Sequence, residues 1–492
     1  MEALMNFKLR TLFAIIFSTM LLTCGQKVEK MTSSDKMPIT SMSKEAIKAY
    51  HDAREFTDKL QNSQAAERYR RAVQLDPGFA LAWIKLAIVS QGTENFLNAL
   101  DSAKHHSTRV SLAEQRIIKS FDYAVKGDVV GQRNELNALV QEYPGDEEAH
   151  LLKGNLLFGL QEYHQAIESY QTAIDIDPKM PIPYNQLGYC QRALGSYGKA
   201  EKAFKQYIAL NAQNPNAYDS YAELLLEMGR YPESIEYYQQ ALAIDPLFIT
   251  SHIGIACDYG FMGDHDASRS QLSKIRARAQ SPTDLSRINY AEAVTYVCEG
   301  DIATAIEIIE ANLSTSIKRG DIPNMSNDLV GIGNLYLESG ASDRALAHFN
   351  RSIQLISESD LQTAIVANAQ DLHLYNIARV YSSQGDMERA WETAEVFKKE
   401  VVASKNPVQI RLAHQLFGII ALADKQFELA IQELELADQM NPYNLFRMGE
   451  AHEQLGHPEL AKDMKQRAAD LNVLNSMDQA IVLSRTRFAQ TN

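Results

Sequence analysis

The sequence is poor in the residues that build metal, redox and disulfide sites. It has four cysteines in 492 residues, and no two of them are spaced as CxxC. This distribution indicates neither a zinc site nor a disulfide framework. Cys190, Cys257 and Cys298 lie in apolar stretches with helical periodicity, where a thiol commonly packs as a small hydrophobic side chain. We therefore expect no metal and no cofactor.

The motifs that mark common enzymes are also missing. The sequence contains no glycine-rich phosphate loop, no HExxH and no GxSxG. Its densest ligand-like groups are His105-His106 and Asp264-His265-Asp266. The first is expected at an exposed helix end and the second at a turn between helices, where surface packing explains both. We therefore expect that the protein is not an enzyme.

Basic residues are fewer than acidic ones, with 48 Lys and Arg against 62 Asp and Glu, so the formal net charge is −14. This balance argues against a nucleic-acid partner, which needs a basic surface. The composition, 45% hydrophobic and 22% charged, is that of a folded soluble chain. Because 492 residues exceed what one hydrophobic core supports, several domains or a repeat array are expected.

The only long apolar run lies at the N-terminus, at Thr11–Leu22, and follows the basic residues Lys8 and Arg10. It is too short to span a bilayer as a helix, but suits the core of a signal peptide. The run ends in Leu-Leu-Thr-Cys-Gly, which resembles a bacterial lipobox with its cysteine at Cys24. Thr23 departs from the Gly, Ala or Ser usual before that cysteine. A plain secretory peptide or an uncleaved anchor is the alternative.

The lipobox resemblance implies that residues 1–24 are a lipoprotein signal peptide and that Cys24 carries the lipid. Residues 25–45 are polar and lack helical periodicity, so they are expected to form a flexible tether. Acyl chains on Cys24 would hold the protein to a membrane without a transmembrane helix. The expected location is the bacterial cell envelope, at the outer membrane on its periplasmic or surface side.

A repeat dominates the rest of the chain. Between residues 147 and 248, three blocks align at a spacing of 34 residues without a gap. Small residues share one position of the block and aromatic residues share another. The two columns are Gly154, Gly188 and Ala222, and Tyr170, Phe204 and Tyr238. Glycines that can end a helix in the left-handed conformation follow at Gly195, Gly229 and Gly263.

Each column has a physical reason. Two amphipathic helices must cross closely to bury their apolar faces, and small residues let the backbones approach while aromatic rings fill the adjacent space. Pro178 and Pro246 end the second helix before the next block begins. One such pair cannot cover its own apolar face, so neighbouring pairs must stack.

The block length and its columns resemble the tetratricopeptide repeat. The resemblance implies an all-α, right-handed superhelical solenoid of about 12 helix-turn-helix units. We expect a regular array over residues 46–282 and a degenerate array with insertions over 283–475. Residues 476–492 are expected to form a C-terminal capping helix and a tail.

In this family the first helix of each pair lines a concave groove, and ligands contact its inward positions. The resemblance therefore implies a set of candidate peptide-binding residues. They are Asn155, Phe158, Asn185, Tyr189, Arg192, Asp219, Glu223, Phe261, Tyr290, Asn334, Tyr375 and Arg379. Aromatic, Asn and Arg side chains suit an extended peptide, because rings supply contact area while amides and guanidinium groups satisfy polar atoms. The alternative is that several of them only pack neighbouring repeats.

These features favour a non-catalytic scaffold, lipid-anchored in the envelope, that binds a protein or peptide partner in its groove. The alternative is a lipoprotein that captures glycans or nutrients for an outer-membrane transporter. Such proteins need tryptophan and tyrosine on long loops to stack on sugars, whereas this chain has two tryptophans and short insertions.

Overall fold

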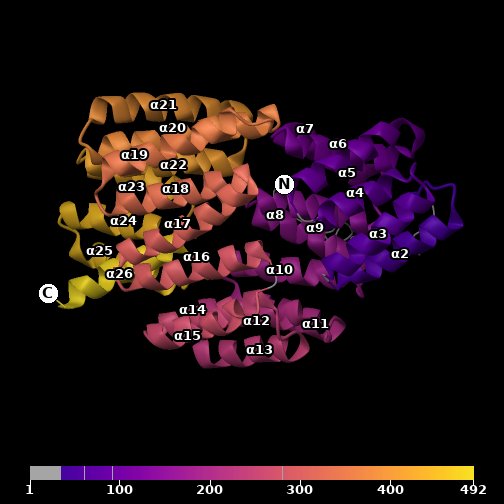
Figure 1. The fold of residues 1–492 in the computed structure, drawn as a ribbon, viewed down its shortest axis with the longest axis horizontal. Helices are drawn as coiled ribbons and strands as arrows, with labels where there is room; N and C mark the ends of the chain where they lie inside the picture. The colour runs from indigo at the N-terminus through magenta and orange to yellow at the C-terminus, as the bar shows by residue number, and fades with distance from the viewer. Residues whose placement is uncertain (1–34, 60, 91, 280, 492) are drawn as a thin grey trace, which may run out of the picture.

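The computed structural model describes residues 35–59, 61–90, 92–279 and 281–491, so Cys24 and the expected signal peptide lie outside the described residues. The described residues form twenty-five α-helices and one 3-10 turn, with no strand among them. Twenty-four of the helices follow one another as twelve antiparallel pairs, and α26 (Met477–Thr491) comes last (Figure 1). The pairs are α2 (Lys44–Asp58) with α3 (Asn62–Leu75), α4 (Ala80–Val89) with α5 (Thr93–His106), α6 (Leu112–Val125) with α7 (Val129–Glu142), α8 (Glu147–Gly159) with α9 (Tyr163–Ile176), α10 (Pro181–Ala193) with α11 (Tyr197–Leu210), α12 (Pro215–Glu227) with α13 (Tyr231–Ile244), α14 (Ile249–Phe261) with α15 (His265–Arg276), α16 (Pro282–Cys298) with α17 (Ile302–Arg319), α18 (Ile322–Glu338) with α19 (Ser342–Ser357), α20 (Thr363–Ser383) with α21 (Met387–Ser404), α22 (Pro407–Ala423) with α23 (Phe427–Leu436), and α24 (Pro442–Gln454) with α25 (Pro458–Asp470). The all-α solenoid of twelve pairs expected from the sequence is confirmed.

The small and aromatic columns meet as the repeat pattern predicts. A Cβ atom built on Gly154 would lie 2.5 Å from the ring of Tyr170, and one built on Gly188 would lie 2.7 Å from the ring of Phe204. Both rings are fully buried. The missing side chain is therefore what allows the two helices of a pair to close on the ring between them.

The helices lengthen in the second half of the array. The first helices α8, α10, α12 and α14 have 13 residues each, whereas α16, α18 and α22 have 17 and α20 has 21. The second helices α17, α19 and α21 lengthen too, to 18, 16 and 18 residues, against 14 in α9, α11 and α13. The additional residues of the second half thus extend helices of both kinds instead of forming long loops. No helix among the described residues is both long enough and apolar enough to cross a bilayer.

Contacts also join units that are far apart along the chain. The side chain of Asn211 donates to the carbonyl of Asp58 at 3.1 Å, which links the loop after α11 to the end of α2. Arg411 in α22 donates to the carbonyl of Leu160 at 2.8 Å, and Gln161 donates to Asp438 at 3.2 Å. The array therefore turns back on itself: in Figure 1 the early units lie on the right, the middle units below and the later units on the left.

The segment before α2 differs from the expected flexible tether. Residues 36–42 run along the starts of the first helices of three later units, and we call them the N-terminal strap. The amide of Met37 donates to Asp146 at 2.9 Å, the amide and hydroxyl of Thr40 donate to Glu114 at 3.0 and 2.6 Å, and the amide of Met42 donates to Asp76 at 2.9 Å. Carboxylates at successive units thus hold the strap's backbone, so the expected tether of residues 25–45 is wrong for these residues.

Helix α26 does more than cover the last unit, the role expected for residues 476–492. It packs on α24 and α25, but also on α16, which lies nearly two hundred residues earlier in the chain. The turn that leads into α26 contains Asn472 and Asn475 in the left-handed conformation, with φ of 49° and 50°. Asn472 also accepts a hydrogen bond from Tyr231 at 2.9 Å. The C-terminal segment therefore connects the end of the array to its middle.

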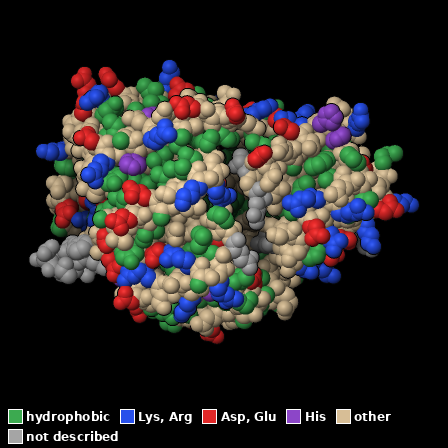
Figure 2. Space-filling model, viewed as in Figure 1, with side chains coloured by type: hydrophobic (Ala, Val, Ile, Leu, Met, Phe, Trp, Pro, Cys, Tyr) green, Lys and Arg blue, Asp and Glu red, His purple; other side chains and the backbone are tan. Residues whose placement is uncertain are grey.

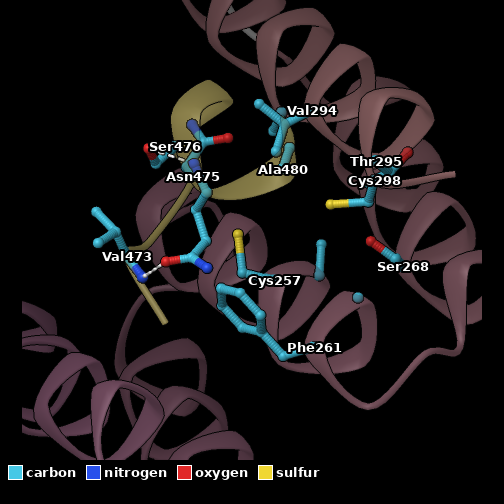
Figure 3. A pocket seen from close by; sticks show the side chains of 14 residues that line it. Cys257, Phe261, Ser268, Val294, Thr295, Cys298, Val473, Asn475, Ser476 and Ala480 are labelled. Carbon is cyan, nitrogen blue, oxygen red and sulfur yellow. Dashed lines mark hydrogen bonds between the residues drawn. The ribbon is translucent and has the colours of Figure 1, made fainter. Parts of the chain in front are cut away.

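Figure 3 shows where this segment meets α14 and α16. Cys257, Phe261 and Cys298 face the same small cavity as Asn475 and Ala480, with a volume of about 30 Å³. Burial raises the pKa of the Cys257 thiol to about 12, which disfavours the reactive thiolate. Cys257 therefore acts as a small packing residue at this junction.

Candidate binding cleft on the concave face

The twelve candidate groove residues all lie on first helices, but the structure gives them two different environments. In the middle of the array, Tyr189 and Arg192 of α10 contact Glu223 of α12. The Tyr189 hydroxyl donates to Glu223 at 3.0 Å, and the Arg192 guanidinium donates to it at 2.7 Å. Arg192 also lies 3.1 Å from Glu227 and stacks on the Tyr189 ring. This network joins neighbouring units, which agrees with the alternative that several candidates only pack neighbouring repeats.

Five further candidates also make contacts within the array. Asn185 and Asp219 are buried, and Ser251 donates to Asp219 at 2.6 Å. Asn155 accepts the Tyr170 hydroxyl at 3.0 Å. Two rings pack on neighbours: Phe158 meets Tyr163 edge-on with centroids 5.8 Å apart, and Phe261 stacks on Tyr231 at 5.9 Å. These side chains therefore support the solenoid more than they offer a free surface.

Internal ion pairs also close the concave side of the first units. Glu148 of α8 pairs with Lys85 of α4, and Arg54 of α2 lies 3.5 Å from the same carboxylate. The charges of Lys85 and Arg54 hold the pKa of this buried Glu148 below its usual value, against the effect of desolvation. The opposite charges on this side of the first units are already paired with each other.

The remaining four candidates come together. Tyr290, Asn334, Tyr375 and Arg379 line one open cleft of about 730 Å³ on the concave face of the second half. First helices α16, α18, α20, α22 and α24 contribute to its walls, and Met477, Asp478 and Ile481 of α26 complete them. We call this space the second-half cleft. Its volume is in the range of protein ligand sites, so it can receive another molecule. A smaller adjoining space of about 410 Å³ shares Tyr290 and Asp328 with it.

Hydrogen bonds between successive first helices fix the wall of the second-half cleft. Arg379 of α20 donates to Asn334 of α18 at 2.8 Å, and Gln415 of α22 donates to the hydroxyl of Tyr375 at 3.0 Å. Asn444 of α24 extends the series by donating to Gln415 at 3.4 Å. Each side chain is thereby held in place before any ligand arrives, which lowers the entropic cost of binding.

The carboxylates of the cleft have partners of their own. Glu338 accepts the Tyr443 hydroxyl at 2.9 Å and pairs with Arg485 of α26 at 2.5 Å. Asp478 accepts the side-chain amide of Asn441 at 2.8 Å. Burial raises the pKa of Asp328 to about 6, although the Ser316 hydroxyl donates to it at 3.0 Å. Arg485 thus neutralises Glu338, whereas Asp478 and Asp328 accept hydrogen bonds from neutral side chains of this chain.

Sequence reasoning missed Arg447 and Gln415, which also line the cleft, and the three residues of α26. The insertion before α22 shifts the repeat register, so the inward position of Gln415 was not recognised, although Tyr375 and Arg379 of the preceding α20 were. Pro442 begins α24, and a proline of this kind marks a helix start in the sequence. Counting from that start would have predicted an inward position for Arg447.

The structure also accounts for the histidine cluster at the start of α15. Asp264 caps the helix by accepting the amide of Ala267 at 2.9 Å, and Asp266 pairs with Arg269 at 2.7 Å. Within the described ranges, no three His, Cys, Asp or Glu side chains gather as a metal-binding group. On the face seen in Figure 2, basic and acidic side chains are mixed over the surface.

Comparison with known proteins identifies the repeat. Family models described as "TPR repeat" and "Tetratricopeptide repeat" match residues 154–191 and 186–247. The chain is 29% identical over 149 residues to the small glutamine-rich tetratricopeptide repeat-containing protein 2 of Mycosarcoma maydis. This alignment covers 29% of this chain and 40% of that protein. It is 24% identical over 222 residues to the peroxisomal targeting signal receptor of Kluyveromyces lactis, which covers 43% of this chain and 38% of the receptor.

The chain thus spans well under half the length of these curated relatives. Among solved structures, a tetratricopeptide repeat protein from Parabacteroides merdae aligns with 54% of this chain and 99% of its own, at 17% identity and a TM-score of 0.37. The matched residues 154–247 hold the small and aromatic columns whose packing was described above. The chain therefore contains tetratricopeptide repeats, stacked into an all-helical solenoid.

Proposed function

We propose that the protein is a non-catalytic scaffold that binds a segment of a partner protein in the second-half cleft and is anchored in a bacterial envelope through lipid on Cys24. The observation that carries the binding role is the convergence of Tyr290, Asn334, Tyr375 and Arg379 on one open cleft. Rings, amides and a guanidinium in a space of this size are the chemistry of peptide recognition.

Two further observations support the proposal. The Kluyveromyces lactis relative is named as a receptor for a targeting signal, so a protein with similar repeats recognises a signal. Charged side chains of the first units are paired with one another, whereas the second-half cleft is the largest of the open spaces described here. Lipid anchoring is supported by the sequence of residues 1–24.

The strap gives the proposed anchor a defined reach. Lys36, where the strap begins with an ion pair to Glu147, is the twelfth residue after Cys24. A fully extended chain of that length spans about 40 Å. A lipid on Cys24 would therefore keep the array close to the membrane, with the starts of α4, α6 and α8 nearest to the anchor.

A photocrosslinking amino acid in the cleft tests the binding role. Leu372 lines the cleft and is 37% exposed, so a benzoylphenylalanine there should form a specific crosslink to one protein in cells that make this chain. Val396 of α21 is 49% exposed and does not line the cleft, which makes it the matched control position. Identical crosslinked bands from both positions would argue against the cleft as the binding site.

The anchor has its own test. Cells fed an alkyne-bearing fatty acid should label the wild-type protein, and Cys24→Ser should abolish the label and move the protein from the membrane fraction to the soluble fraction. Cys190→Ser, at a buried position of α10, is the matched control and should keep the label. A wild-type protein without label would refute the lipid anchor and leave the binding role untouched.

A further inference from the structure

Two arginines of the second-half cleft, Arg379 and Arg447, have no carboxylate at salt-bridge distance among the described residues, and both line the cleft. Arg379 stacks over the Tyr375 ring at 5.3 Å and uses one nitrogen to donate to Asn334 at 2.8 Å and to Asn376 at 3.4 Å. Arg447 stacks over the Tyr443 ring at 3.6 Å. Each guanidinium is therefore fixed on a ring while most of its five N–H donors remain available.

Two other arginines, Arg192 of α10 and Arg485 of α26, show the contrast. Arg192 contacts both Glu223 and Glu227, and Arg485 contacts Glu338. A guanidinium that is partly buried gains most from a carboxylate, since bidentate pairs of this kind are the strongest hydrogen bonds available to it. The array supplies such a partner at Arg192 and Arg485 but leaves Arg379 and Arg447 without one inside the cleft.

Other features of the cleft suit an extended chain. Asn334 accepts from Arg379 through its oxygen, so its NH₂ group can donate to a backbone carbonyl of a ligand. Leu361, just before α20, and Ile365 and Leu372, in the first half of that helix, form an apolar surface along the same wall. A segment with apolar side chains on one side and carboxylates on the other would satisfy both surfaces.

We propose that the second-half cleft selects an extended, carboxylate-bearing segment of a partner protein, with Arg379 and Arg447 each pairing with a carboxylate of that segment. This inference rests on the proposed function and names the chemistry of the partner. The positions of Arg379 and Arg447 on α20 and α24, with α22 between them, place the two charges on different units. The segment must therefore cross three first helices.

Selection from a random-peptide phage library on the immobilised full chain tests this directly. Peptides recovered on wild-type protein should be enriched in Asp and Glu, and fluorescence anisotropy should show binding weakened about tenfold or more by replacing those residues with Asn and Gln. Arg379→Gln with Arg447→Gln should weaken the parent peptide to a similar extent. Arg344→Gln is the matched control, because Arg344 also stacks on a tyrosine, Tyr336, at 5.6 Å but does not line the cleft.

Leu372→Trp separates failure of this inference from failure of the proposed function, because it obstructs the cleft without changing charge. One outcome would overturn the carboxylate proposal and leave the cleft as a binding site. In that outcome the selected peptides lose binding with Leu372→Trp, but they are not enriched in Asp and Glu and still bind the variant with Arg379→Gln and Arg447→Gln. Peptides indifferent to Leu372→Trp would overturn both. All variants should first show the wild-type thermal midpoint by circular dichroism, so that altered binding reports on the cleft.

Discussion

Replacing Asp258 by Asn should stabilise the protein at alkaline pH and flatten the decline of its stability between about pH 5 and about pH 9. Asp258 lies in α14 with no exposed surface, and its Oδ1 atom has no hydrogen-bond partner. Burial raises the pKa of its carboxyl from 3.8 to about 8. The folded protein therefore keeps, up to about pH 8, a proton that the unfolded chain has already released above its pKa of 3.8. The stability that this group contributes is fully present below pH 3.8 and is lost as the pH rises toward 8.

The geometry independently favours the neutral acid. The Ser234 hydroxyl lies 2.9 Å from both the carbonyl of Ala222 and Oδ2 of Asp258, yet it has one proton to donate. A protonated Asp258 resolves this by donating to Ser234 while Ser234 donates to Ala222. The side-chain amide of Asn can make the same donation without a charge, so it can replace the protonated acid.

Urea unfolding near pH 5 and near pH 9 measures the effect. Wild-type stability should fall by a few kcal/mol between these values, on the order of what such a pKa shift represents, and Asp258→Asn should lose a large part of that fall. Asp219 and Glu227, whose pKa values burial raises to about 7, account for a further decline in the same direction. Equal destabilisation by Asp258→Asn at both pH values would mean that the native carboxylate is ionised.

Gly254→Ala should destabilise the protein by about 3 kcal/mol or more. A Cβ atom at this position of α14 would lie 2.1 Å from the ring of Tyr238, which is fully buried between α12 and α14. The ring cannot retreat, since Ala222 and Leu226 of α12 belong to the same packed cluster. Added volume must therefore separate the units, and the loss of packing should appear as a lower urea midpoint.

Gly159→Ala provides the control, because a Cβ atom at that end of α8 meets nothing within 4 Å. There the substitution should be neutral or stabilise the helix by about 0.5 kcal/mol, through the lower backbone entropy of alanine. A similar loss of stability from both substitutions would show that Gly254 acts through helix propensity and not through contact with Tyr238.

The sequence predicted the repeat well because each column reports a local contact. Gly154 and Tyr170 face each other sixteen residues apart, within one pair, and so the spacing alone identifies the contact. The N-terminal strap was not predictable in this way. Its amides bind Asp76, Glu114 and Asp146. Asp76 follows α3, whereas Glu114 and Asp146 lie at the starts of α6 and α8, so in the sequence all three look like ordinary helix-end residues.

The candidate site shows a different limit. Register places Tyr189 and Tyr375 equally well on inward faces, but only the structure shows that Tyr189 donates to Glu223 of the next unit whereas Tyr375 lines an open cleft. Whether an inward side chain meets a neighbouring unit or open space depends on superhelical curvature. Curvature results from small angles accumulated over many units, and no single position in the sequence encodes it.

The contacts between distant units change the expected mechanical behaviour of this solenoid. An array in which each unit touches only its neighbours can stretch like a spring and fray from its ends. Here α26 joins α16, Asn211 joins Asp58 and Arg411 joins Leu160, so each end is fastened to an interior unit. Pulling the ends apart would first have to break these fastenings. The array should therefore resist extension, and the helices around the second-half cleft should move little relative to one another.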